Sequence, residues 1–107
     1  MFWLIDSAGA RIQELAGSQF AGSGSLFKDQ VEMSGLVPQI AAVMGPTAAG
    51  TSYIAALADF IPIVSNAGTM ALAGPALVKA AVGETVDIQE LGGAKVHAQK
   101  SGVAHLE

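Results

Sequence analysis

The stretch "VPQIAAVMGPTAAGTSYIAALAD", residues 37–59, places an apolar run, a turn of tiny residues and an alanine-rich run in direct succession. The run from Val37 to Met44 predicts a buried strand, with Pro38 at its start, where a missing N–H is tolerated. We expect Gly45 and Pro46 to end this strand, and residues 51–58 to form a short helix. A strand, a tight turn and a helix in this order are typical of α/β folds.

The same alternation extends in both directions along the chain. Apolar runs predict further strands at 2–5, 60–64 and 69–73, while helical patterns cover 10–15, 25–33 and the segment from Pro75 to Gly83. Asp87 and Glu90 have the spacing of an N-terminal capping pair for a helix that closes at 92–93, and the tail is a helix candidate through Lys100. Residues 16–25 are rich in glycine and serine and predict a loop. The pattern indicates one α/β layered domain with short crossovers.

The composition requires a partner for the apolar surface. Hydrophobic residues make up 51% of the 107 and charged residues only 13%, which is more apolar material than a free-standing domain of this size usually buries. A missing remainder of the chain, a subunit partner or a membrane would cover it. The uncharged run from Met33 to Ala58 is long enough for a bilayer, but glycines and prolines divide it into shorter elements, which disfavours a membrane span.

Charge and cysteine content narrow the functional classes. The net charge is -4 and the five basic residues are scattered, so the sequence argues against nucleic acid as a partner. No cysteine is present, which excludes a disulfide framework and a thiolate metal site. The start "MFWLID" lacks the basic region of a signal peptide. We therefore expect a cytoplasmic protein.

The small-residue turn after the central strand has two interpretations. A helix beginning at this turn leaves unpaired backbone N–H groups, and the lack of bulk at Ala48, Ala49 and Gly50 lets a ligand approach them closely. Such donors can form an oxyanion hole without any reactive side chain. Alternatively, the small residues only allow close packing of helix on sheet, and the pattern alone favours this second interpretation. No lysine follows Gly50 as a phosphate-binding loop requires.

A second small-residue turn follows the first predicted strand in "DSAGARIQE", residues 6–14. It offers backbone donors as well, with Arg11 available for an anionic group. Two such turns together can each supply a donor to one shared oxygen. The alternative is that Arg11 pairs with Asp6 or Glu14 at the surface.

Other polar residues carry little catalytic signal. His97 and His105 have no placed carboxylate partner, so structural hydrogen bonds explain them better than a role as general base. Neither they nor the aspartates have metal-ligand spacing, and we predict no metal. Ser7, Thr47 and Ser52 lack the context of an acyl-enzyme nucleophile. Tyr53 is expected to pack or to line a pocket.

Three stretches together resemble one enzyme family. They are "LIDSAGARIQE" (4–14), "PQIAAVMGPTAAGTSYIAALADF" (38–60) and "ALAGPALVKAAVGETVDIQELGGAKVHAQKSGVAH" (71–105). In order and spacing they resemble the carboxyltransferase (β) subunits of biotin-dependent acyl-CoA carboxylases of the propionyl- and methylcrotonyl-CoA type, and their decarboxylase relatives. The resemblance runs from the second residue nearly to the last.

The resemblance implies a crotonase/ClpP-like α/β superhelix of ββα units, of which residues 1–107 would be a partial N-terminal domain, truncated at both ends. It implies transfer of a carboxyl group between N1 of biotin and the α-carbon of an acyl-CoA, with the enolate held by backbone N–H groups. By motif position the catalytic donors would be Ala49, Gly50 and Thr51. The substrate would contact a turn and a tyrosine, namely Ala8, Gly9, Ala10, Arg11 and Tyr53.

The implied partners are acyl-CoA, biotin on a separate carrier domain, a biotin carboxylase subunit and further copies of the β subunit. The family commonly has two glycines where this chain has Ala49-Gly50, and a donor survives that change unless the turn requires a positive φ. We expect the 107 residues not to turn over without the second domain of the family. Two alternatives stay open: a non-catalytic assembly module, and a crotonase-like hydratase or hydrolase. A hydratase would need acidic pairs, yet no Glu lies between Glu32 and Glu84.

Overall fold

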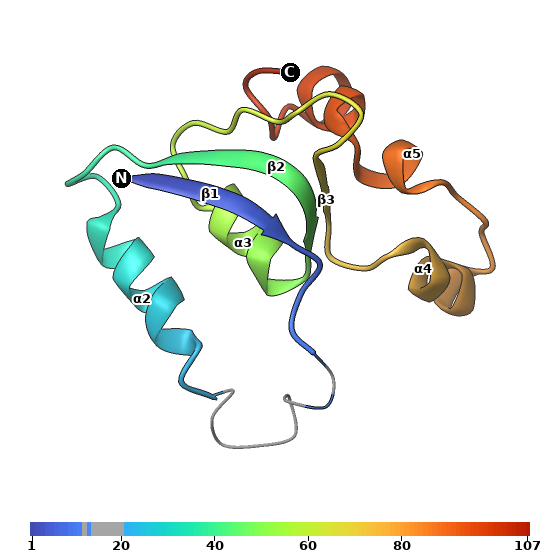
Figure 1. Cartoon of the computed structure of the whole chain (residues 1–107), viewed down its shortest axis with the longest axis horizontal. Coiled ribbons are helices and arrows are strands. Elements are labelled where there is room, and N and C mark those ends of the chain that lie inside the picture. Colours follow the sequence, from blue (N-terminus) through green and yellow to red (C-terminus); the bar gives the residue numbers. More distant parts are fainter. Residues whose placement is uncertain (12, 14–20) are drawn as a thin grey trace.

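The computed structural model describes residues 1–11, 13 and 21–107. Three parallel strands form a sheet of order β1-β2-β3, with β1 at Phe2–Ser7, β2 at Ile40–Ala48 and β3 at Thr69–Ala71. The helices are α2 (Gly24–Met33), α3 (Gly50–Ala56), α4 (Pro75–Val82), α5 (Ile88–Gly92) and the π-helix η2 (Val96–Ser101). The α/β class predicted from the sequence is confirmed (Figure 1).

The central strand is longer than predicted. It begins at Ile40 and continues through Gly45 and Pro46 to Ala48, so the prediction that these two residues end it is wrong. The register explains why, because Ile5 pairs with Val43 but Ser7 pairs with Thr47. One residue of β1 therefore faces three of β2, and Pro46 with its missing N–H lies in this bulge.

The strand predicted at 60–64 forms only isolated bridges beside β2. Phe60 and Ile63 pair with Ile40 and Val43, and the Phe60 and Pro62 carbonyls accept hydrogen bonds from β2 amides. Pro62 has no N–H to donate, which limits a continuous ladder here. β3 ends at Ala71, two residues short of the prediction.

The helix signals are largely confirmed. Pro75 occupies the first turn of α4 and Gly83 ends it in the left-handed conformation, while the Asp87 side chain caps α5 by accepting from the Gln89 amide at 2.8 Å. In α2, Gln30 is buried, whereas Val31 is exposed. Ala10 and Arg11 are not helical. Residues 12, 14 and 15 of the helix predicted at 10–15 and residues 16–20 of the loop predicted at 16–25 lie outside the described residues, while Gly24 and Ser25 of that loop already belong to α2.

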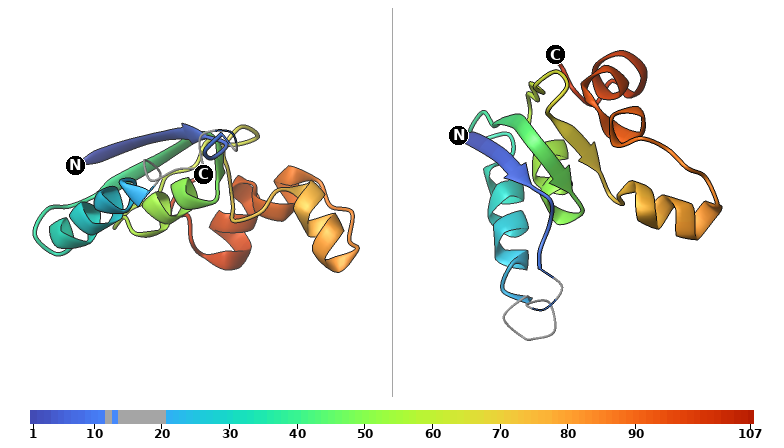
Figure 2. Two further views of the ribbon diagram at one scale, coloured as in Figure 1. Left: turned by 90° about the horizontal axis from the view of Figure 1, so that it is seen from below. Right: turned by 45° about the vertical axis from the view of Figure 1, so that its right-hand side comes forward.

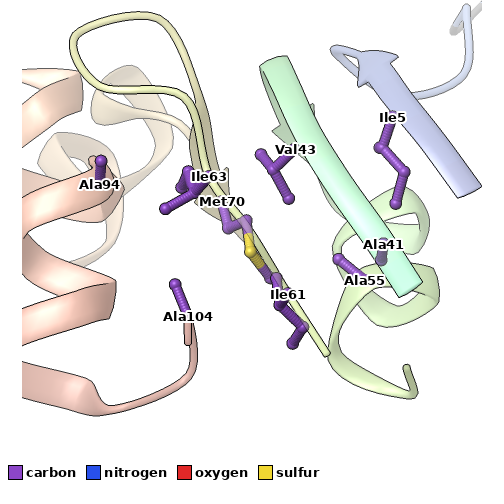
Figure 3. Packing of buried hydrophobic residues seen from close by; sticks show 9 residues of the cluster. All are labelled: Ile5, Ala41, Val43, Ala55, Ile61, Ile63, Met70, Ala94 and Ala104. Carbon is purple, nitrogen blue, oxygen red and sulfur yellow. The ribbon is translucent and has the colours of Figure 1, made fainter. Parts of the chain in front are cut away.

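A small apolar core joins the sheet to the helices on one side. Figure 3 shows it as aliphatic side chains and methyl groups, from Ile5, Ala41, Val43, Ala55, Ile61, Ile63, Met70, Ala94 and Ala104. In the edge-on view of Figure 2 the helices all lie on the same side of the strands. The side chains of Phe2, Leu4 and Met44 are exposed, as the composition predicted for a chain with more apolar surface than it can bury. No helix of the described residues is long and apolar enough to cross a membrane.

Candidate functional site

A cleft of about 360 Å³ opens where β1 and β2 end. The turn after β1 and the turn between β2 and α3 form one side of it, and α2 faces them with apolar side chains. Its lining is Ala8, Gly9, Ala10, Ser23, Leu26, Phe27, Ala49, Gly50, Thr51 and Ile54. The two small-residue turns that the sequence suggested therefore border one cavity.

Two glycines lie where an added Cβ would already make van der Waals contact with a neighbouring group, so that a longer side chain would enter the cleft. A Cβ added at Gly50 would lie 3.5 Å from Cζ of Phe27, and one at Gly9 would lie 3.7 Å from the Ala48 carbonyl oxygen. Gly9 also has a φ of +101°, which side-chain-bearing residues rarely adopt. Bulk at either position would fill the cleft or separate its walls.

The turn between β2 and α3 is strained at Ala49. This residue has φ 53° and ψ -122°, the conformation of the first central residue of a type II′ turn, where glycine is the usual occupant. The turn therefore does require a positive φ, which is the condition under which a change from glycine to alanine was expected to affect the donor geometry. The Ala49 backbone turns the chain out of the sheet and into α3.

The amides of this turn differ in availability. The Ala49 N–H donates to the Ala71 carbonyl of β3 at 3.0 Å, so the prediction that Ala49 offers a free donor is corrected. The Ser52 amide donates to the Ala49 carbonyl at 3.1 Å. No hydrogen bond joins the Gly50 or Thr51 amide to another residue in the described part of the chain. Both residues border the cleft, as expected for the first amides of a helix.

Side-chain hydroxyls fasten this turn from two sides. Thr51 Oγ1 accepts a hydrogen bond from the Ala48 amide at 3.1 Å, and its proton lies within reach of the Ala48 and Ser7 carbonyls, at 2.7 and 3.0 Å. Ser52 Oγ lies 3.0 Å from the Thr47 carbonyl oxygen and 3.1 Å from that of Ala71. From the sequence, Ser52 was considered only as a nucleophile and Thr51 only for its backbone amide, so this structural role of the two hydroxyls was not predicted.

Buried glutamines hold α2 against the sheet and α3. Gln30 Nε2 donates to the Ile54 carbonyl at 2.7 Å, and Gln39 Nε2 donates to the Gln30 carbonyl at 3.0 Å. Trp3 Nε1 in turn donates to Gln39 Oε1 at 3.1 Å. Because both glutamine side chains are buried, breaking these bonds would be costly, and they hold α2, which carries Phe27, in place beside the cleft.

The substrate-binding residues predicted from the sequence separate into two groups. Ala8, Gly9 and Ala10 line the cleft, whereas Arg11 and Tyr53 are not among its lining residues. The Tyr53 ring instead packs edge-on against the Phe27 ring, with centroids 6.3 Å apart, and so contacts a residue that lines the cleft. Leu26 and Phe27, the apolar residues that α2 contributes to the cleft, were not among the site residues predicted from the sequence.

Both histidines make structural hydrogen bonds, as predicted. Nε2 of His97 lies 2.8 Å from the Met70 carbonyl oxygen and must carry the proton, so Nδ1 accepts from the Ser101 hydroxyl at 2.9 Å. Nδ1 of His105 accepts from the Ile61 amide at 3.1 Å. Neither residue lines the cleft. In the part of the chain that the structure describes, no group of three His, Cys, Asp or Glu residues is placed to hold a metal ion.

Curated proteins similar to this chain in sequence include carboxylase and decarboxylase subunits. The propionyl-CoA carboxylase carboxyltransferase subunit of Haloferax mediterranei is 50% identical over 103 residues, covering 96% of this chain and 20% of its own length. Methylmalonyl-CoA decarboxylase subunit alpha of Veillonella parvula is 49% identical over 101 residues, covering 94% and 20%. The chain thus spans about one fifth of the curated relatives it matches.

Solved structures give the same result. The crystal structure of the transcarboxylase 12S hexamer superimposes with a TM-score of 0.87 at 44% identity, over 96% of this chain and 20% of that one. Carboxyltransferases have the crotonase-like fold, so the fold implied by the sequence resemblance is confirmed. The family of carboxyl transferase domains matches residues 1–107. The chain belongs to the carboxyl transferase domain family.

Proposed function

We propose that this chain forms the acyl-CoA-binding portion of a biotin-dependent carboxyltransferase. The observation that carries the proposal is the cleft bordered by the Gly50 and Thr51 amides, which have no partner among the described residues. Membership of the carboxyl transferase domain family supplies the reaction class. A solved 12S transcarboxylase bears hydrolysed methylmalonyl-coenzyme A, which supports a CoA ester as the ligand.

In the proposed reaction the two amides hold the thioester oxygen. Loss of the α-proton places negative charge on this oxygen, and donors already aimed at it stabilise the enolate without reorganisation. Each is worth about 3 kcal/mol of barrier on the scale of oxyanion-hole mutations. The enolate carbon then forms a bond to the carboxyl carbon. Carboxybiotin on its separate carrier domain would supply that carboxyl group as its N1–carboxyl bond breaks, and N1 would take up the α-proton; the reverse direction would exchange the same proton and carboxyl group.

The cleft walls would place the acyl group. Leu26, Phe27 and Ile54 offer apolar surface beside Gly50, while the Ala8–Ala10 turn borders the same space. An acyl group packed against these walls would displace water from the reacting ester, which would strengthen its hydrogen bonds to the amides. Arg11 follows the turn and is a candidate for the anionic part of the coenzyme.

The remaining expectations concern the complete enzyme. We propose that turnover requires a second domain, that copies of the subunit assemble, and that a biotin carboxyl carrier and a biotin carboxylase subunit are partners. The hexamer assembly of the 12S transcarboxylase supports the assembly. The cytoplasmic location stays a prediction. The exposed side chains of Phe2, Leu4 and Met44 favour a second candidate, a non-catalytic assembly module with the same fold.

Acyl-CoA binding to the chain distinguishes the two candidates. Calorimetry with propionyl-CoA should show binding that Gly50→Leu abolishes, because the new side chain would enter the cleft toward Phe27. Gly74→Leu is the matched control, since nothing lies within 4 Å of a Cβ at that glycine. Failure of the unaltered, folded chain to bind would favour the assembly module.

A further inference from the structure

The strained turn at Ala49 persists because its neighbours hold it. A residue with a side chain at φ 53° and ψ -122° keeps that conformation only where surrounding contacts over-determine it. The contacts here come from both flanking strands. These contacts, from Ser7 of β1 and Ala71 of β3, also fix the start of α3, where the amides of Gly50 and Thr51 lie.

On the β1 side the contact is the Thr51 hydroxyl. Oγ1 accepts from the Ala48 amide and donates toward the carbonyls of Ala48 and Ser7, so a single oxygen joins the ends of β1 and β2. These two strand ends carry the two turns that border the cleft. No other hydroxyl in the described part of the chain bonds to both strand ends.

On the β3 side the Ala71 carbonyl is the anchor. It accepts from the Ala49 amide at 3.0 Å and lies 3.1 Å from the Ser52 hydroxyl, which is buried. The residue before the strained position and the residue at it are thus held from opposite sides. The amides of Gly50 and Thr51, which come next, take no part in these bonds.

We propose that Thr51 is a positioning residue. Its hydroxyl, together with the Ser52 hydroxyl, holds the turn in the conformation that places the Gly50 and Thr51 amides against a ligand carbonyl. This inference rests on the proposed function, because it assigns a cause to the placement of the proposed donors. The hydroxyl does not touch the reacting atoms. Its effect reaches the ligand only through the backbone.

The test compares a thioester with a thioether that lacks the carbonyl oxygen. Propionyl-CoA and S-propyl-CoA differ at that oxygen, so the ratio of their dissociation constants isolates the contact with the amides. Two neutral hydrogen bonds predict a preference of roughly 10-fold for the thioester in the unaltered chain. Thr51→Val should reduce the preference to about 2-fold, whereas Thr51→Ser should retain it, because serine keeps the hydroxyl.

Thr47→Val is the matched control, since it removes a buried hydroxyl near the end of β2 whose hydrogen bond reaches only the Gly45 carbonyl, at 3.3 Å. It should keep the preference. If Thr51→Val does not fold, Ser52→Ala tests the hydrogen bonds that hold the turn to β3. Loss of the preference for the thioester in this variant would support the proposal. A preference that survives in the folded variant overturns the positioning role alone. Equal binding of both ligands by the unaltered chain overturns the proposed function as well.

Discussion

Replacing Ala49 with glycine should stabilise the protein. Alanine in a conformation of this kind costs on the order of 1–3 kcal/mol, because its Cβ crowds the backbone. Glycine relieves that strain but loses roughly 0.5–1 kcal/mol more conformational entropy on folding. The balance is a gain of about 1 kcal/mol, which for a domain near this size raises the melting temperature by roughly 4–8 °C.

Thermal unfolding followed by circular dichroism measures this gain against a neighbouring control. Ala48→Gly makes the same chemical change one residue earlier, where the backbone is part of β2. Without strain to relieve, it should lower stability by about 0.5–1 kcal/mol. If Ala49→Gly lowers the melting temperature as Ala48→Gly does, the inference of strain at this turn is refuted.

Three further substitutions probe the fold and the cleft. Gly92→Ala should destabilise by about 1–3 kcal/mol in urea unfolding, because its Cβ would collide with the Met70 carbonyl, whereas Gly24→Ala, in open space, should not. Asp87→Ala removes the cap of α5 and should cost about 1 kcal/mol by the same assay; an unchanged midpoint would contradict the cap. Phe27→Ala removes an apolar side chain that lines the cleft and should weaken propionyl-CoA binding roughly 10-fold by calorimetry. An unchanged dissociation constant would mean that the ligand binds elsewhere.

Local signals predicted most of the fold. The small residues after an apolar run predicted a turn before α3, although they placed its start at Gly45 and Pro46 instead of Ala49. Pro75 and Gly83 marked the ends of α4, because each acts through its own backbone conformation. The failures depend on pairing. β2 passes through Pro46 because a bulge opposite β1 removes the need for its N–H, and no local pattern shows which residues a strand will face.

The candidate site was predictable as a location but not in its hydrogen bonds. The two turns were visible as small residues, yet the Ala49 amide is occupied by Ala71 of β3, a contact between separate strands. The wall from α2 depends on Gln30 and Gln39, buried polar residues whose partners only the tertiary structure supplies. Phe27 was identifiable as apolar, but its position opposite Gly50 follows from that packing.

Amide NMR can show whether the backbone amides of Gly50 and Thr51 hold the carbonyl oxygen of a coenzyme A ester. Propionyl-CoA should move the proton resonances of these two amides downfield, while S-propyl-CoA, which contacts the same walls, should not. The Ala49 amide should respond to neither ligand, because it is bonded to Ala71. Equal shifts of the Gly50 and Thr51 amides with both ligands, or no shift with either, would show that these amides do not bind the carbonyl oxygen.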